Sequence, residues 1–200
     1  MPLLDLLGGS LQVEFISNEL HGADDAAIVQ RSFKVRGVAT GSEEEEEELV
    51  VRHIHYRTWP DFGVPESDEC LRTVLRLVNP CCLLGGSVPA VEATPARLDR
   101  LLVHCSAGIG RTGTFCVIDA MVRSMHHSLS LGGCFTRDTA AAAATDGTTD
   151  GSIDPVLSSI LVFRSQRRGM VETINQLGYI YRYLHNHHKD FIRPCLELTT

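Results

Sequence analysis

The stretch Val103-His104-Cys105-Ser106-Ala107-Gly108-Ile109-Gly110-Arg111-Thr112-Gly113 follows the apolar pair Leu101-Leu102 and precedes an apolar, helix-like pattern. It predicts a buried strand that delivers Cys105 to a glycine-containing loop, which Arg111 closes and a helix follows. Backbone N–H groups that point into such a loop, with a helix N-terminus behind them, form a concave anion site. Arg111 adds a planar fork that matches two phosphate oxygens. The same positive field lowers the pKa of the Cys105 thiol into the range of activated thiols, roughly 3.5–7.5.

A second stretch with the same cysteine-to-arginine spacing shows what the spacing alone is worth. Cys70 and Arg76 are also separated by five residues, but none of the five is a glycine. Apolar residues in this stretch recur at the spacing of one helical face, which predicts a packed helix. A helix interior has no free N–H groups to offer an anion. The phosphate site is therefore expected at Cys105 and not at Cys70.

Composition limits the classes of protein and partner. The chain has 200 residues, 44% of them hydrophobic and 22% charged, as expected of one globular domain with a real core. A net charge of −7 argues against nucleic acid as a partner, because phosphate backbones are bound by basic surfaces. The seven cysteines lack the pairing of a disulfide framework, and no segment predicts membrane insertion. A catalytic thiolate needs reducing surroundings, so we expect a cytoplasmic protein.

Strand-like patterns come first in the chain and helix-like patterns later. Three strands are expected, and the first two are expected to be antiparallel and half-buried because their apolar residues alternate with polar ones. Asp154 and Pro155 are good N-cap and first-turn residues for a later helix. This order predicts an α+β domain. The expected strands are 11–15, 33–36 and 49–56, and the expected helices begin at 67, after 113, at 155 and at 173. The Glu43–Glu48 run is expected to be a solvated loop, and residues 131–151 a low-complexity insertion.

Three segments carry a resemblance to a known family. They are Trp59-Pro60-Asp61-Phe62-Gly63-Val64-Pro65, His104 to Gly113, and Gln166-Arg167-Arg168-Gly169-Met170-Val171-Glu172-Thr173 with Gln176. In this order they resemble the cysteine-based, tyrosine-specific protein tyrosine phosphatases, and the likeness runs from about residue 11 to residue 190. The resemblance implies a three-layer αβα fold with a twisted mixed sheet flanked by helices. It implies a strand–phosphate loop–helix active site and hydrolysis of phosphotyrosine in proteins.

The resemblance also implies a role for each catalytic residue. Cys105 attacks phosphorus and forms a cysteinyl-phosphate, while Arg111 holds the equatorial oxygens of the phosphoryl group. Asp61, on a mobile loop, protonates the leaving tyrosine oxygen and then activates water. Thr112 steadies the departing thiolate and His104 orients the loop.

Further implied roles concern water and substrate. Gln176 matches one of the two glutamines that position the hydrolytic water, and Arg164 supports the cysteine loop from behind. Tyrosine-phosphorylated proteins are the implied partners, with no metal or other cofactor, and the oligomeric state stays open. The residues expected to contact substrate are Ser106, Ala107, Gly108, Ile109, Gly110, Arg111, Phe62 and Glu172.

Two departures from the family pattern stand out. Glu172 lies where the family usually has the other water-positioning glutamine, and its carboxylate would repel the phosphocysteine dianion. A slower second step is therefore expected. The likeness also covers only the C-terminal part of a family domain. We expect an N-terminal segment at 1–10, a truncated catalytic domain at 11–194 and a tail at 195–200.

Two other functions are open at this point. The shortened domain is compatible with an impaired fragment or a pseudophosphatase that binds phosphotyrosine, although a pure binder needs neither Cys105 nor Asp61. A dual-specificity or lipid phosphatase shares the cysteine loop. The lipid enzymes tend to carry lysines there, and the loop between Cys105 and Arg111 has none.

Overall fold

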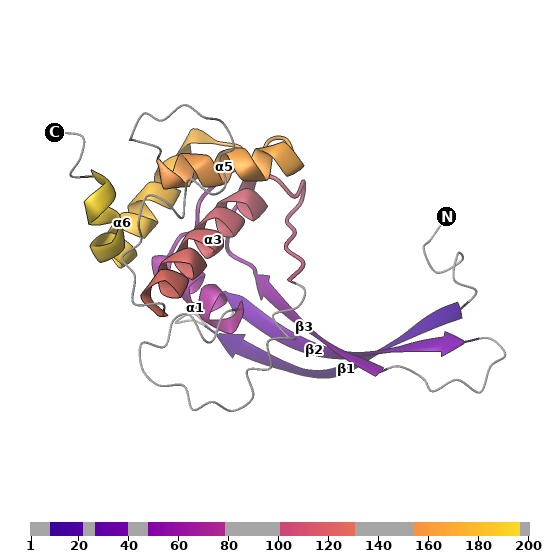
Figure 1. The fold of residues 1–200 in the computed structure, drawn as a ribbon. Helices are drawn as coiled ribbons and strands as arrows, with labels where there is room; N and C mark the ends of the chain where they lie inside the picture. The colour runs from indigo at the N-terminus through magenta and orange to yellow at the C-terminus, as the bar shows by residue number, and fades with distance from the viewer. Residues whose placement is uncertain (1–8, 22–26, 40–47, 79–100, 131–153, 197–200) are drawn as a thin grey trace. The chain divides into compact units, whose positions relative to one another are not determined.

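A computed structural model describes residues 9–21, 27–39, 48–78, 101–130 and 154–196 (Figure 1). The chain divides into two compact units. The first consists of Met1–Thr58 with Glu69–Leu77, and the second of Trp59–Asp68 with Val78–Thr200. The expected insertion at 131–151 and most of the glutamate run lie outside the described residues.

Three antiparallel strands build the first unit. They are β1 (Gly9–His21), β2 (Ile28–Ala39) and β3 (Glu48–Tyr56), hydrogen-bonded side by side in that order. The register places Phe15 opposite Phe33, and the two rings meet edge to face with centroids 5.9 Å apart. Each expected strand is thus confirmed, and the first two extend further than their alternating patterns indicate, because backbone pairing continues past the apolar residues.

Burial along β1 differs from the prediction. Leu11, Val13 and Phe15 are 53–64% exposed, so β1 is not the half-buried strand that its alternation indicates. β1 pairs only with β2, and the described residues bring no element over its apolar side chains. Glu48 is also not part of a solvated loop, because it begins β3 and pairs with Lys34 and Arg36. These two cations lower the pKa of its carboxyl.

One helix follows the third strand. Helix α1 (Asp68–Val78) buries Leu71, Val74 and Leu75, the apolar face that its sequence predicts. Cys70 and Arg76 lie on this helix, so the predicted packed helix is confirmed there. The cysteine has no loop of backbone N–H groups around it.

Three helices form the core of the second unit. Helix α3 (Gly110–Ser130) packs against both α5 (Pro155–Gln166) and α6 (Ile174–Leu196), as Figure 1 shows. Asp154 caps α5 as predicted, since its Oδ1 accepts hydrogen bonds from the backbone N–H groups of Val156 and Leu157. The buried residues of the three helices are mainly apolar. They include Phe115, Val117, Ile118, Met121, Val122, Met125, Val156, Ile160, Tyr179, Ile180, Tyr183 and Leu184.

The α+β class is confirmed, with one difference before the cysteine loop. The sheet of the described residues is antiparallel throughout, and residues 101–105 have no regular secondary structure. A strand requires a neighbour that pairs with its backbone, and no described segment supplies one there. The buried strand expected before Cys105 is therefore replaced by irregular chain, in which Leu101 and Leu102 are 48% and 87% exposed, and the expected mixed sheet is not found among the described residues. None of the described helices combines the length and apolar character needed to cross a membrane.

Candidate active site

The loop between Cys105 and α3 wraps around the cysteine sulfur. The backbone N–H of Gly108 donates a hydrogen bond to Cys105 Sγ over 3.2 Å. Gly108 adopts a φ of 70°, a left-handed conformation that glycine adopts without a steric penalty. Helix α3 then begins at Gly110, so its N-terminus, which is the positive end of the helix dipole, lies directly behind the loop.

These surroundings change the acidity of Cys105. Partial burial raises the pKa of the thiol, but hydrogen bonds outweigh that effect and lower it from 9.0 to about 7. The Thr112 hydroxyl contributes most to the lowering, although it forms no well-aligned hydrogen bond to the sulfur, and the backbone N–H groups of Thr112, Gly108 and Ile109 add to it. The predicted lowering is therefore confirmed, and a large fraction of Cys105 is thiolate near neutral pH.

Two arginines, Arg164 in the last turn of α5 and Arg167 directly after it, bond to backbone carbonyls in and around the cysteine loop. Arg167 donates from Nε to the Gly108 carbonyl and from Nη2 to the Ala107 carbonyl, both over 2.9 Å. Because the two carbonyls are held outward, the N–H groups of the loop are left to face the sulfur. Arg164 binds the carbonyls of Met170 and Val171 instead. Arg164 thus reaches the cysteine loop through Val171, whose N–H donates to the Ile109 carbonyl, while Arg167 bonds to the loop directly.

A tight turn carries Asp61 to the same place. The Trp59 indole N–H donates to the Gly63 carbonyl over 3.1 Å, and the Gly63 N–H donates to the Pro60 carbonyl over 3.2 Å. Arg111 connects this turn to the cysteine loop. Its Nη1 donates to the Trp59 carbonyl over 2.8 Å, and its Nη2 forms an ion pair with Asp61 Oδ1.

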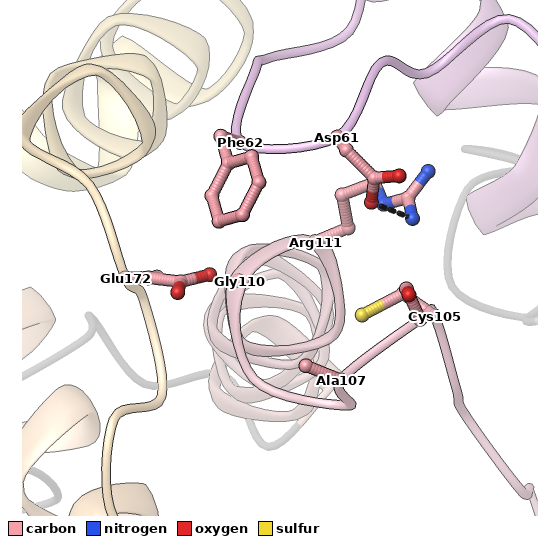
Figure 2. A pocket seen from close by; sticks show the side chains of 8 residues that line it. Asp61, Phe62, Cys105, Ala107, Gly110, Arg111 and Glu172 are labelled. Carbon is pink, nitrogen blue, oxygen red and sulfur yellow. Dashed lines mark hydrogen bonds and ion pairs between the residues drawn. The ribbon is translucent and has the colours of Figure 1, made fainter.

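A pocket opens where these parts meet. Figure 2 shows the Cys105 sulfur pointing into it, the Asp61 and Phe62 side chains descending from one turn, and Glu172 on another side. The dashed line in the figure marks the ion pair of Asp61 with Arg111. The lining residues are Asp61, Phe62, Cys105, Ser106, Ala107, Gly110, Arg111 and Glu172.

Glu172 is aimed at this pocket by its neighbours. Val171 has a φ of 60°, and its N–H donates to the Ile109 carbonyl over 3.2 Å. The Glu172 carboxylate then lies beside Gly110, where a Cβ would come within 2.9 Å of Oε2. A carboxylate therefore lies over the start of α3, among the groups that would surround a phosphate.

The other predicted site residues lie outside the pocket lining. Gly108, Ile109 and Thr112 act on the sulfur from within the loop, as the pKa of Cys105 shows. His104 is exposed, and its side chain does not line the pocket. Gln176 is fully buried and bonded to backbone groups on two segments.

Arg167 and Thr173 contact the site, although neither was among the predicted site residues. Arg167 bonds to the cysteine loop, and the Thr173 hydroxyl donates to the Phe62 carbonyl over 3.3 Å. Both residues lie within the third family-like segment, and that position was the one available signal. Among the described residues, no cluster of His, Cys, Asp or Glu side chains is arranged to hold a metal ion.

Comparison with known proteins identifies this architecture. The family model for protein-tyrosine phosphatases matches residues 7–186. Protein-tyrosine-phosphatase PTP1 of Arabidopsis thaliana is 30% identical over 157 residues, which are 78% of this chain and 35% of that protein. Tyrosine-protein phosphatase non-receptor type 61F of Drosophila melanogaster is 32% identical over 156 residues, or 78% of this chain and 21% of that protein. Receptor-type tyrosine-protein phosphatase alpha of Homo sapiens is 31% identical over 158 residues, or 79% of this chain and 15% of that protein.

A solved structure supports the fold. The structure described as the structural basis of PTPN18 fingerprint on distinct HER2 tyrosine phosphorylation sites superposes with a TM-score of 0.57 at 23% identity. The match covers 88% of this chain and 48% of that one. This chain therefore spans less than half the length of the solved structure and of each relative named above. The chain belongs to the protein-tyrosine phosphatase family.

Proposed function

We propose that this chain hydrolyses phosphotyrosine in proteins through a cysteinyl-phosphate intermediate. The observation that carries the proposal is the thiol of Cys105, whose pKa is lowered to about 7 and which shares one pocket with Asp61 and Arg111. A thiolate, a cation for phosphate and a carboxyl group are the parts that this reaction needs. Tyrosine-phosphorylated proteins are the proposed partners, and the cytoplasm, where thiols stay reduced, is the proposed compartment.

The first step transfers the phosphoryl group to the enzyme. The phosphate takes the place of Asp61 at the Arg111 fork, and this exchange releases the carboxyl group for proton transfer. The Cys105 thiolate attacks phosphorus in line, and the bond from phosphorus to the tyrosyl oxygen breaks. Asp61 in its acid form gives its proton to that oxygen, so that neutral tyrosine leaves.

The second step regenerates the enzyme. A water molecule attacks the phosphorus of the cysteinyl-phosphate while Asp61, now a carboxylate, accepts a proton from the water. The bond from phosphorus to sulfur breaks, inorganic phosphate forms, and Cys105 returns to its thiolate. The same hydrogen bonds that lower the pKa of Cys105 make this thiolate a good leaving group.

Purified residues 1–200 should hydrolyse a phosphotyrosyl peptide and leave the matching phosphoseryl peptide intact. The Asp61→Ala variant should still bind the phosphotyrosyl peptide but cleave it about 10²–10⁴ times more slowly, because it lacks the general acid. Acid quenching of the reaction should trap phosphate on Cys105. A chain that binds phosphotyrosine without turnover or trapped phosphate would contradict the proposal.

A further inference from the structure

Gln176 lies where three segments of the active site meet. Its side chain is fully buried at the start of α6, and it does not line the pocket. Its Oε1 accepts hydrogen bonds from the backbone N–H groups of Glu172 over 3.0 Å and Thr173 over 3.2 Å. Its Nε2 donates to the carbonyl of Gly63 over 3.2 Å. Both ends of the amide are therefore bonded to backbone.

The contact with Gly63 connects Gln176 to the turn that carries Asp61. The Gly63 carbonyl accepts two hydrogen bonds, one from Gln176 Nε2 and one from the Trp59 indole. Trp59 and Gly63 are the two ends of this turn, and Asp61 lies between them. A shift of the Gly63 carbonyl would therefore change the direction of the Asp61 side chain.

Thr173 makes a second contact with the same turn. Its hydroxyl donates to the Phe62 carbonyl over 3.3 Å and accepts from the Gln176 N–H over 3.2 Å. Phe62 has a φ of 59°, which a residue other than glycine holds only where its surroundings fix it. The contacts at Phe62 and Gly63 are adjacent, and they are the surroundings that hold this conformation.

We propose that Gln176, together with Thr173, is a positioning residue that holds the Asp61 turn over Cys105. This inference rests on the proposed function, because it assigns Gln176 to the placement of the general acid. It differs from the expected role of positioning the hydrolytic water, since both ends of the amide are bonded to backbone and the buried side chain does not line the pocket. Of the two positions that correspond to the family's water-positioning glutamines, position 172 is the one that lines the pocket and faces the hydrolytic water.

Comparing two substrates distinguishes a variant that misplaces the general acid from one that loses structure in general. A general acid matters most for a basic leaving group such as the tyrosyl oxygen, and little for p-nitrophenyl phosphate, whose phenol is far more acidic. Gln176→Met should lower kcat/KM for a phosphotyrosyl peptide about tenfold, roughly the effect of one lost hydrogen bond, and leave kcat/KM for p-nitrophenyl phosphate nearly unchanged. An equal loss for both substrates, or a fall in kcat alone, would overturn the proposal.

A second variant guards against poor folding of the buried substitution. Thr173→Val removes the hydroxyl that bonds to Phe62, and Thr173→Ser keeps it. Thr173→Val should reproduce the selective loss of kcat/KM on the phosphotyrosyl peptide, and Thr173→Ser should keep kcat/KM near that of the unchanged chain. Ser158→Ala is the matched control, because it also removes a hydroxyl bonded to a backbone carbonyl, but on α5.

In an Asp61→Asn background, Gln176→Met should cause no further loss on phosphotyrosine, since it acts through Asp61; an additive loss would overturn the proposal.

The single tryptophan of the chain gives a readout that needs no activity. Trp59 is 7% exposed and shares the Gly63 carbonyl with Gln176. Gln176→Met and Thr173→Val should therefore shift its emission to longer wavelength and increase its quenching by acrylamide, while Ser158→Ala should not. Unchanged fluorescence would overturn the positioning role even in an active enzyme. If the wild-type chain cleaves neither substrate but the two variants still show these fluorescence changes, the proposed function is contradicted and the positioning contact is still supported.

Discussion

Cys70 and Cys105 offer a comparison within one molecule, since each is followed by an arginine at the same spacing. Around Cys70 the chain is helical, and Arg76 pairs with Glu69 on the same helix. Around Cys105 the chain is a loop, whose N–H groups lower the pKa of the thiol, and Arg111 reaches a distant turn. The cysteine, the arginine and their spacing are the same in both places. The surroundings of the two thiols therefore differ because the backbone between cysteine and arginine is helical in one place and a loop in the other. Helical N–H groups are already bonded, whereas those of the loop are available to an anion.

The largest expected effect compares the two thiols directly. Cys105→Ser should abolish turnover of a phosphotyrosyl peptide, because a serine hydroxyl at that position is not ionised near neutral pH. Cys70→Ser should leave turnover unchanged. Steady-state hydrolysis by both variants, with circular dichroism as the folding control, measures the contrast. Equal losses would mean that the thiols act through structure and not through chemistry.

The two arginines provide the next comparison. Arg111→Lys should lower kcat about 10²–10³-fold, since an ammonium cannot supply the planar fork that binds two oxygens at once. Arg76→Lys, on α1, should change kcat by less than the error of the measurement, because its pair with Glu69 lies on an exposed helix surface. A mild effect of Arg111→Lys would show that point charge alone suffices at this site.

The pKa of the Cys105 thiol should rise when the Thr112 hydroxyl is removed. With a pKa of about 7, Cys105 should be alkylated by iodoacetate at a rate that rises with pH and reaches half its maximum near pH 7. Thr112→Val removes the hydroxyl that lowers this pKa most and should move the midpoint upward, toward the ordinary value of 9.0. The alkylation rate of Cys70, followed by mass spectrometry in the same samples, is the internal reference. An unchanged midpoint would assign the lowered pKa to the backbone alone.

The smallest expected effect concerns two carboxylates, Glu172 in the pocket of Cys105 and Glu69 next to Cys70 in the sequence. Glu172→Gln should raise steady-state turnover a few-fold, because it removes a negative charge that faces the phosphocysteine and supplies an amide for water. Glu69→Gln, the neighbour of Cys70, should leave turnover unchanged. Rapid-quench measurement of the burst and the steady-state rate distinguishes the two steps. A slower second step in Glu172→Gln would mean that the carboxylate assists the water.

Local features of this protein were predictable from local patterns. The helix around Cys70, the cap at Asp154 and the three strands follow from periodicity and residue type, because their hydrogen bonds are made near in sequence or across short connections. The lowered pKa of Cys105 was also predictable, since its donors lie within the next seven residues. Exposure of β1 was not, because alternation shows which side chains share a face and not whether that face is covered.

By itself, the sequence determined the glycine-containing loop and the acidic thiol that it surrounds, because the glycines, the cysteine and the start of α3 act over neighbouring residues. Only the tertiary structure decided that Arg111 reaches the Trp59 carbonyl and that Arg167 braces the loop. It also decided that Gln176 is bonded to the Asp61 turn and not exposed to the pocket. Each of these contacts joins segments more than fifty residues apart in the chain. Their partners are chosen by how the helices pack, and no local preference of the chain specifies that packing.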